Sequence, residues 1–289
     1  MAVLIISSTE DPAGTNIKDS LLEQSSWNEI DSFSNLPVYE HSKMKDIVIA
    51  TIQDRTIRHE SIDRDIQEKL GIKPKQVIFI SRHRSKTGPP TLTTHHIGNY
   101  GNVTDFGGKS KTLVKSSPRL ATHLLKLMKK NATKLYHKVC FEVTHHGPHL
   151  ETPTIFAEVG SNEEEWEKKE PASVVAKSLL ELLEKYHYEE DFPNDIPVLI
   201  GIGGGHYAPR FTEVALAKKV AFGHMIPTYQ IEDGNVDEEI LEKAIQATPN
   251  VKGVYLHKKE LKKSQVTEYK NWFEGKGIPV FSSKELEDL

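Results

Sequence analysis

Residues 77–80 read VIFI, a short run of β-branched and aromatic residues between Gln76 and Ser81. Similar runs are VLII at residues 3–6 and VLIGI at residues 198–202. A strand that is apolar at every position has both of its faces covered, as happens in parallel sheets with helices on either side. By this criterion the expected strands are residues 2–7, 46–51, 76–81, 138–144, 154–159, 198–202, 224–229, 251–256 and 279–281.

Amphipathic stretches separate these strands, and they predict helices over residues 62–70, 118–130, 163–186, 212–220, 237–247 and 261–273. Pro171 lies inside the third stretch, so we expect one helix to end before it and another to carry Pro171 in its first turn. The alternation predicts an α/β fold in three layers, with a mostly parallel or mixed central sheet and helices on both faces. With no repeat and no long linker, residues 1–289 are expected to form one domain, interrupted by an irregular loop or small insertion around residues 86–117.

The amino-acid composition limits which residue types can bind a metal. The 289 residues include 14 His and a single Cys, and 41 acidic against 37 basic residues give a net charge of −4. One cysteine excludes an intrachain disulfide and a cysteine-based zinc cage, which leaves His, Asp and Glu as possible metal ligands. We see neither a signal peptide nor a membrane span, so the expected location is cytoplasmic, with no membrane contact and no obligate protein partner.

Polar side chains follow three of the expected strands at the point where each strand ends. They are Arg82, His83 and Arg84, then His145, His146, His149 and Glu151, and finally His206 and Arg210. Ligands of open α/β sheets bind beyond the carboxyl ends of parallel strands. If the three strands are parallel, these loops meet at one edge, and the sequence predicts a site there.

The segment THHGPHLETP, residues 144–153, has the richest chemistry. His145 and His149 cannot share a helical face, because Gly147 and Pro148 lie between them, but a turn can point both at one centre. His146, Glu151 and Thr152 add candidate ligands or proton carriers, and neutral imidazoles with a carboxylate suit zinc with a position left for water. The competing interpretation is a polar loop whose histidines bind the backbone.

Two further loops suggest anion binding. The amides of Gly203, Gly204 and Gly205, before a helix, can face a phosphate, a carboxylate or an oxyanion; a tight strand–helix connection explains the glycines equally well. Arg82 and Arg84 flank His83 and can hold a phosphate while His83 acts on the adjacent group, unless they simply form a solvated basic loop.

Lysines cluster locally despite the negative total. Lys109, Lys111, Lys115, Lys129 and Lys130 are candidates for a face that binds RNA phosphates. A solvated helix face is the alternative interpretation of each such cluster.

Four segments together resemble the archaeal and plant type of D-aminoacyl-tRNA deacylase: SRHRS at 81–85, TTHHIGNYG at 93–101, FEVTHHGPHLETPTIFAEVGS at 141–161 and GIGGGHYAPRFTEVA at 201–215. The resemblance implies hydrolysis of the ester that joins a D-amino acid to the 3′ end of tRNA, which keeps D-residues out of translation. It also implies zinc dependence and a core similar to those of purine nucleoside phosphorylases and peptidyl-tRNA hydrolases.

The residues and this resemblance together give a hypothesis for the site. Its catalytic residues are His83, His145, His146 and His206, and its metal ligands come from His145, His149, Glu151 and His206. Substrate contacts are assigned to Arg82, Arg84, His95, His96, Gly203, Gly204, Gly205 and Arg210. Whether the metal, a histidine or the 2′-hydroxyl of the RNA activates the water stays open at this point. The alternative functions are a nucleoside phosphorylase-like enzyme and a non-catalytic tRNA-binding protein.

Overall fold

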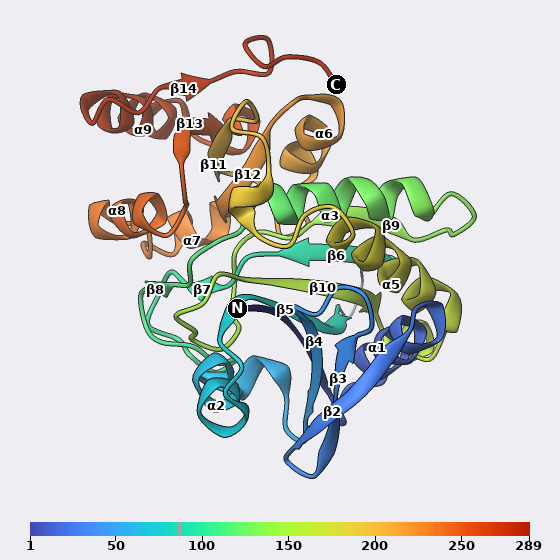
Figure 1. Ribbon diagram of the computed structural model, residues 1–289. Helices are drawn as coiled ribbons and strands as arrows, with labels where there is room; N and C mark the ends of the chain where they lie inside the picture. The colour runs from blue at the N-terminus through green and yellow to red at the C-terminus, as the bar shows by residue number, and fades with distance from the viewer. Residues whose placement is uncertain (86–87) are drawn as a thin grey trace.

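The computed structural model describes residues 1–85 and 88–289, so Lys86 and Thr87 of the expected irregular loop lie outside the described residues. Its largest element is an eight-stranded sheet (Figure 1). In spatial order the strands are β2 (Trp27–Phe33), β3 (Leu36–His41), β4 (Ile47–Ile52), β1 (Ala2–Ser8), β5 (Pro74–Arg84), β10 (Thr154–Ser161), β6 (Thr91–His95) and β9 (Lys138–Phe141). Strands β4, β1, β5 and β10 are mutually parallel, whereas β6 runs antiparallel to β10. The predicted α/β architecture with a mostly parallel, mixed sheet is confirmed.

The continuous apolar runs are explained by helices on both faces of this sheet. Ile78 and Ile80 pack with helices α1 (Pro12–Gln24), α3 (Pro118–Asn131) and α5 (Lys169–Leu183), whereas Val77 and Phe79 pack with α2 (Ile62–Leu70) on the opposite face. Neighbouring residues of a strand point to opposite faces, so a sheet covered on both sides needs apolar residues at every position.

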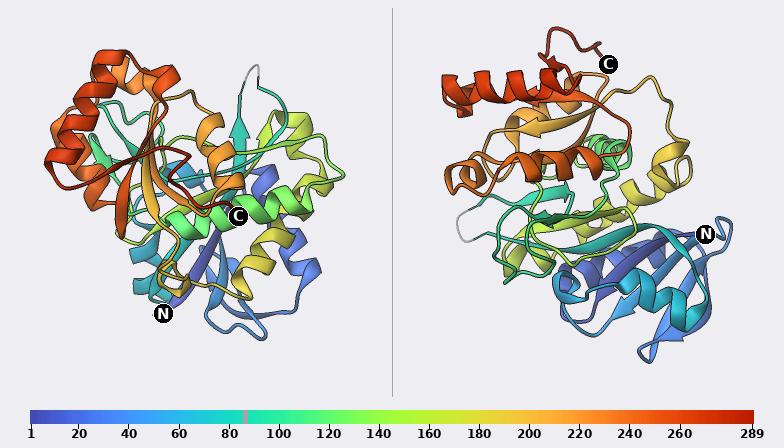
Figure 2. Two further views of the ribbon diagram at one scale, coloured as in Figure 1. Left: turned by 90° about the horizontal axis from the view of Figure 1, so that it is seen from above. Right: turned by 90° about the vertical axis from the view of Figure 1, so that its left-hand side faces the viewer.

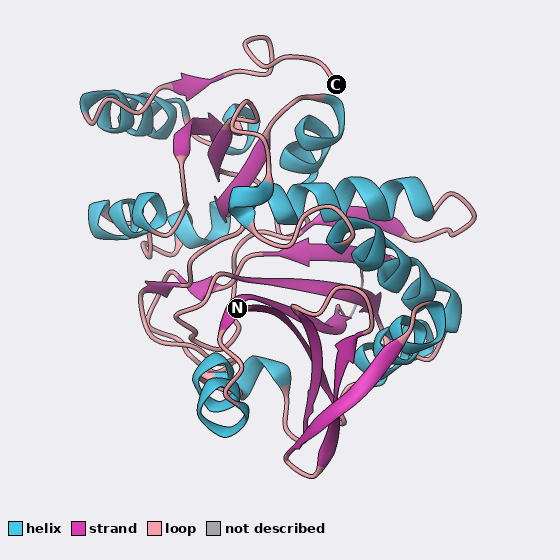
Figure 3. Cartoon of the chain, in the orientation of Figure 1, coloured by secondary structure: helices cyan, strands magenta, loops and turns pink. Residues whose placement is uncertain are grey.

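A second sheet of four parallel strands follows in the C-terminal part, with the order β12 (Ala221–Ile226), β11 (Val198–Ile202), β13 (Val251–Leu256) and β14 (Val280–Phe281). Its helices are α6 (Pro209–Ala217), α7 (Thr228–Glu232), α8 (Glu238–Gln246) and α9 (Lys263–Gly275). Figures 2 and 3 show this part as a layered unit stacked on the large sheet, with α3 between them. One apolar cluster runs through α3 from Leu92 of the large sheet to Phe222 of the small one, so the two sheets share a core.

The remaining elements are short. They are the 3-10 turns η1 (Thr56–Arg58), η2 (Glu189–Asp191) and η3 (Lys258–Glu260), the helix α4 (Glu163–Trp166), and a two-stranded ribbon of β7 (Gly98–Asn99) and β8 (Thr112–Leu113). The expected break in the third helix is present, because α4 ends at Trp166 and α5 carries Pro171 in its first turn.

Several element boundaries differ from the prediction. The strand expected over 224–229 lies at Ala221–Ile226, because Pro227 has no N–H for the ladder and is the N-cap of α7. The strand expected over 138–144 ends at Phe141. Glu142 N–H still donates to Thr94 of β6, but Val143 N–H donates to the His206 carbonyl and Thr144 N–H to that of Met225, both outside the large sheet.

Other elements were not predicted at all. Helix α1, the β2–β3 hairpin and strand β6 occupy stretches with no strong apolar period. Among the described residues, none of the helices combines the length and the apolar character that crossing a membrane requires.

Candidate active site

Residues from three separate segments meet at the buried carboxylate of Glu142, directly after β9. Its Oε1 lies 3.1 Å from Nδ1 of His83 at the end of β5. Its Oε2 lies 2.9 Å from Nε2 of His206, in the loop after β11, and 3.4 Å from Nε2 of His145. The structure therefore brings together His83, His145 and His206 from the three loops that the sequence analysis singled out.

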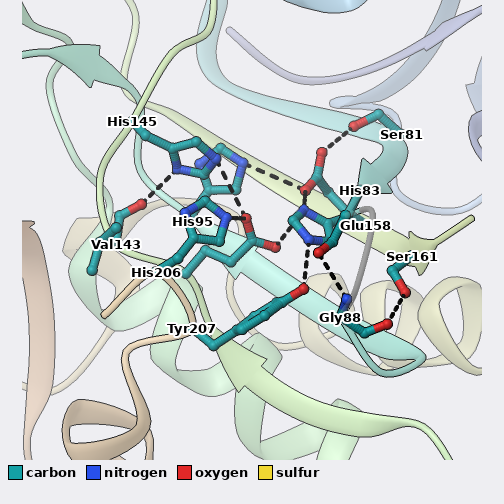
Figure 4. Close-up of polar contacts among 12 residues, drawn as sticks. Ser81, His83, Gly88, His95, Val143, His145, Glu158, Ser161, His206 and Tyr207 are labelled. Atoms are coloured by element: carbon teal, nitrogen blue, oxygen red, sulfur yellow. Dashed lines mark hydrogen bonds and ion pairs between the residues drawn. The ribbon is translucent and has the colours of Figure 1, made fainter. Parts of the chain in front are cut away.

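A second buried carboxylate, Glu158 on β10, lies on the other side of the cluster. The register places it beside Ser81 of β5 and Thr93 of β6, and Ser81 Oγ donates a hydrogen bond of 2.7 Å to its Oε1. Its Oε2 lies 3.6 Å from Nε2 of His95 and 3.8 Å from Nδ1 of His83. Figure 4 shows how the side chains of His83, His95, His145 and Glu158 converge from different elements.

Sequence reasoning missed both acids. Glu142 stands in KVCFEV and Glu158 in TIFAEV, each an acid inside an otherwise apolar strand segment. A lone carboxylate at such a position is costly to bury unless it is paired or coordinates a metal. That cost was the signal available in the sequence.

Hydrogen bonds fix the tautomers of two histidines. Nδ1–H of His145 donates to the carbonyl of Val143 at 2.7 Å, and Nδ1–H of His95 donates to the carbonyl of His96 at 3.0 Å. In the neutral rings each Nε2 then carries a lone pair that faces a carboxylate. Two acceptors at this distance repel each other unless a proton or a cation lies between them.

Buried polar atoms without a partner also indicate that a proton or a cation is required in the cluster. Within the described residues, Nε2 of His95, both carboxylate oxygens of Glu142 and Oε2 of Glu158 are buried without a well-formed hydrogen bond. Buried polar atoms are normally satisfied, so a cluster of unsatisfied ones calls for an ion or water.

The donor atoms are spaced for metal ions. Across residues 1–85 and 88–289, three groups have ligand atoms within 4.8 Å of one another: His95, His145 and His146; His83, Glu142 and His206; and His95, Glu142 and Glu158. The last two groups share Glu142. Imidazole and carboxylate donors without thiolates suit a divalent transition metal.

The protonation states of Glu142, His145 and His146 agree with this role, whereas the nearby carboxylates of Glu142 and Glu158 raise the pKa of His83 and His95 despite burial. Burial alone raises the pKa of Glu142, but the imidazoles of His206 and His83, 2.9 and 3.1 Å away, outweigh it and hold the pKa well below its usual value. Burial lowers the pKa of His146 to about 3 and that of His145 well below its usual value. The carboxylate is therefore charged and both imidazoles are neutral, which is the state in which these groups bind metals.

A cavity of about 680 Å³ gives access to the cluster. Its lining includes His145, His146, Glu158 and His206, and the side chain of His206 is 35% exposed. Arg82 and Arg84 line the same cavity; Arg82 donates to the Glu10 carbonyl at 3.1 Å and Arg84 pairs with the exposed Glu163 at 2.6 Å.

The structure separates His149 and Glu151 from this cluster. His146 and Gly147 have positive φ angles and turn the chain toward α2. There the backbone of His149 donates to Glu60, while the exposed side chain of Glu151 pairs with Arg64. Neither belongs to a group of convergent metal ligands among the described residues.

Two of the three backbone amides in the glycine loop already donate hydrogen bonds within the fold. Gly203 N–H donates to the Ile226 carbonyl and Gly204 N–H to Thr228 Oγ1, both at 2.8 Å. Both glycines have φ near +100°, and a Cβ on either would press against His257 at 3.1–3.2 Å. The tight strand–helix connection explains these glycines, whereas Gly205 is exposed with open space around it.

Two other predicted substrate contacts point elsewhere. Arg210 is held by Tyr255, Ser283 and Glu213, outside the cavity. His96 is fully buried and its Nε2–H donates to the Phe222 carbonyl at 3.1 Å, which joins the two sheets.

The candidate RNA-binding lysines do not form one face. Lys109, Lys111 and Lys115 precede α3, whereas Lys129 and Lys130 lie in its last turn. A helix of 14 residues is about 21 Å long, so the two groups lie a helix length apart. Lys111 and Lys130 are also paired, with Asp237 and Glu181.

Comparison with known proteins gives consistent matches. The profile of a family described as D-aminoacyl-tRNA deacylase matches residues 70–281. A D-aminoacyl-tRNA deacylase of Thermococcus kodakarensis is 38% identical over 247 residues, covering 85% of this chain and 86% of that protein. One from Methanosarcina mazei is 35% identical over 292 residues, covering 99% and 94%. The crystal structure of a conserved protein of unknown function, AF0625, superposes with a TM-score of 0.87 at 31% identity and covers 99% of this chain and 98% of its own.

Proposed function

Because this chain belongs to the D-aminoacyl-tRNA deacylase family and hydrolyses the ester bond of D-aminoacyl-tRNA, we propose that the His–Glu cluster around Glu142 is where this ester is cleaved. The observation that carries the proposal is the convergence of unsatisfied imidazole and carboxylate atoms at the wall of an open cavity. The alternative functions, a nucleoside phosphorylase-like enzyme and a non-catalytic tRNA-binding protein, are not favoured by these relatives.

The cluster fits Zn²⁺. Neutral imidazoles with carboxylates, and no thiolate, form the usual ligand set of catalytic zinc, and backbone carbonyls already orient His95 and His145 through Nδ1–H. The ligands would be His95, His145 and His146 in one group and His83, His206 and Glu142 in another, while Glu158 groups with His95 and Glu142. Bound zinc supplies a Lewis acid that lowers the pKa of water to near 7.

The protein's own residues then position the ester. The carboxylates of Glu142 and Glu158 provide the negative charge of the cluster, and Ser81 holds Glu158 in place. His83 and His206 of the Glu142 group both line the cavity, and His206, with 35% of its side chain exposed, is the one placed to contact the ester.

Arginines on the cavity wall complete the site. Arg82 and Arg84 present guanidinium groups to the cavity and are suited to the phosphates near the 3′ end of the RNA. We assign no anion-binding role to Gly203 and Gly204, since their amides are already used.

The test is metal removal followed by deacylation of matched D- and L-tyrosyl-tRNA. We expect turnover of the D-form to disappear when the metal content falls below about a tenth of an ion per chain, and to return with Zn²⁺ but not with Mg²⁺. Undiminished turnover by the metal-free protein would exclude the metal from the reaction, and the 2′-hydroxyl of the RNA would then be the candidate for activating water.

A further inference from the structure

Two exposed apolar side chains stand at the wall of the catalytic cavity. Phe106 is 61% exposed and Val103 is 69% exposed, and both lie in the loop between β7 and β8 that lines the cavity. Large apolar side chains exposed beside a binding cavity mark a surface that contacts a ligand.

The loop holds Phe106 firmly. Gly107 has a φ of +89°, and a side chain there would collide with the carbonyl of Ile57, so only glycine fits against η1. Asn99 Nδ2–H donates to the Gly107 carbonyl at 2.8 Å, and the Gly108 amide donates to Glu60 Oε1 at 2.7 Å. On the other side, Arg58 donates to the Asp105 carbonyl at 2.9 Å, so the backbone that carries the aromatic ring is fixed before and after it.

Phe106 is also joined to the reactive cluster. Its carbonyl accepts a hydrogen bond of 3.3 Å from the amide of Gly147, the residue after His146. Arg55, Arg82 and Arg84 lie on other parts of the cavity wall. The cavity thus presents a fixed aromatic ring together with guanidinium groups, a combination that matches a nucleotide with its base and its phosphates.

We propose that Phe106, assisted by Val103, stacks against the base of the terminal nucleotide of the tRNA. This inference rests on the proposed function, since it assumes that the ester reaches the buried cluster around Glu142. The base and the ester are attached to the same ribose, so the base must lie within one sugar of the cluster. The exposed ring of Phe106 lies on that same cavity wall, whereas the polar histidines lie deeper.

The experiment compares two substrates on four proteins. The substrates are D-tyrosyl-tRNA and the same D-tyrosyl-tRNA with an abasic terminal nucleotide. The proteins are the wild type, Phe106→Ala, Phe106→Trp, and the control Ile30→Ala, which truncates an exposed apolar residue on β2.

Stacking gives a distinct pattern of rates. We expect Phe106→Ala to raise KM for intact D-tyrosyl-tRNA by about 5- to 100-fold with little change in kcat, and Phe106→Trp to stay near wild type. Removing the terminal base should raise the KM of the wild type by a similar factor and should not raise the KM of Phe106→Ala further. Ile30→Ala should match the wild type, and all four proteins should melt at the same temperature.

Other results overturn the inference in recognisable ways. If the losses from Phe106→Ala and from the abasic substrate multiply, the ring and the base do not touch, and a contact with the tyrosyl side chain becomes the explanation. If Phe106→Ala behaves as wild type, the ring has no role in binding. If the wild type leaves intact D-tyrosyl-tRNA uncleaved, the proposed function fails, independently of Phe106.

Discussion

Glu142 is the residue on which the site depends most. It is fully buried, and three histidine nitrogens approach its two oxygens within 3.4 Å. Its charge balances the cluster, and its substitution would leave imidazoles and any bound cation without a counter-charge.

We therefore expect Glu142→Gln, which keeps the shape and removes the charge, to lower kcat/KM on D-tyrosyl-tRNA by at least about 100-fold and to reduce the bound metal. The measurements are steady-state deacylation and metal content by elemental analysis. The matched control is Glu151→Gln, which changes the exposed partner of Arg64 and should leave both quantities within about twofold of wild type. Equal losses in the two variants would return Glu151 to the ligand set and contradict the central place of Glu142.

The residues of the site were predictable only where their position in the chain was informative. His83, His145 and His206 were identified because each follows an apolar strand, and the carboxyl ends of strands gather functional loops. Glu142 and Glu158 were missed because each reads as one polar letter in an apolar strand, and only the tertiary structure shows their histidine partners. Glu151 was predicted from nearness in sequence, which the turn at His146 and Gly147 makes irrelevant.

At the scale of elements, the N-terminus of α3 shows how a buried ion pair fixes a helix between the two sheets. Glu189 of η2 accepts hydrogen bonds from the amides of Arg119 and Leu120 in the first turn, and its Oε1 lies 3.2 Å from the Arg119 guanidinium. Arg119 is 1% exposed, and its guanidinium also donates to the Ile196 carbonyl at 3.0 and 3.2 Å, so Glu189 is its buried counter-charge. Burial raises the pKa of Glu189 to about 7, although the guanidinium and the amides oppose it, so the pair is best tested at pH 8.5.

We expect Glu189→Ala to lower the free energy of unfolding by about 3–5 kcal/mol, because it leaves the buried guanidinium without a counter-charge and two helix amides unpaired. The measurement is urea unfolding followed by circular dichroism. Its neighbour Glu190 pairs with Lys75 at the surface, with 63% of the glutamate side chain exposed, so Glu190→Ala should cost less than about 1 kcal/mol. A comparable loss of unfolding free energy in both variants would mean that the buried ion pair stabilises the protein no more than the exposed one.

Helices and strands were predictable where the sequence has a clear hydrophobic pattern. Strand β11 and helix α2 lie at the expected residues, because the first is apolar throughout and the second is strongly amphipathic. Strand β2 was not predicted, because five successive residues of this sheet-edge strand are exposed and leave no apolar pattern. Strand β6, TLTTH, is fully buried but built from threonines, so it resembles a loop in composition. Helix α1 had a signal that was not used, with Asp11 as N-cap before Pro12.

At the scale of the whole molecule, the open question is whether residues 1–289 behave as one domain. The structure has two sheets that share an apolar cluster through α3, and His224 sits at the contact between them. His224 lies on β12 of the small sheet; its Nε2–H donates to the Val114 carbonyl at 3.0 Å, and its Nδ1 accepts from Thr144 Oγ1 at 3.1 Å. Both nitrogens are therefore used by the neutral ring, and burial lowers the pKa of His224 to about 3.

This geometry predicts how acid affects the joined structure. The folded state resists protonation of His224 while the unfolded chain accepts a proton near pH 6.5, so the stabilisation from the neutral ring is present above pH 6.5 and is lost as the pH falls toward 3. A shift of this size corresponds to at most about 5 kcal/mol. We expect His224→Gln, which has no titrating group, to be less stable than the wild type at pH 7.5 and to show a difference that shrinks steadily between pH 6 and pH 4. Differential scanning calorimetry over this range measures the difference in stability.

The same scans test whether residues 1–289 form a single domain. One transition with equal calorimetric and van't Hoff enthalpies supports a single domain, because sheets joined by a shared core unfold together. Two transitions in the wild type at pH 7.5 would show that the sheets are separate cooperative units, and a stability difference independent of pH would show that His224 is not held neutral at their contact.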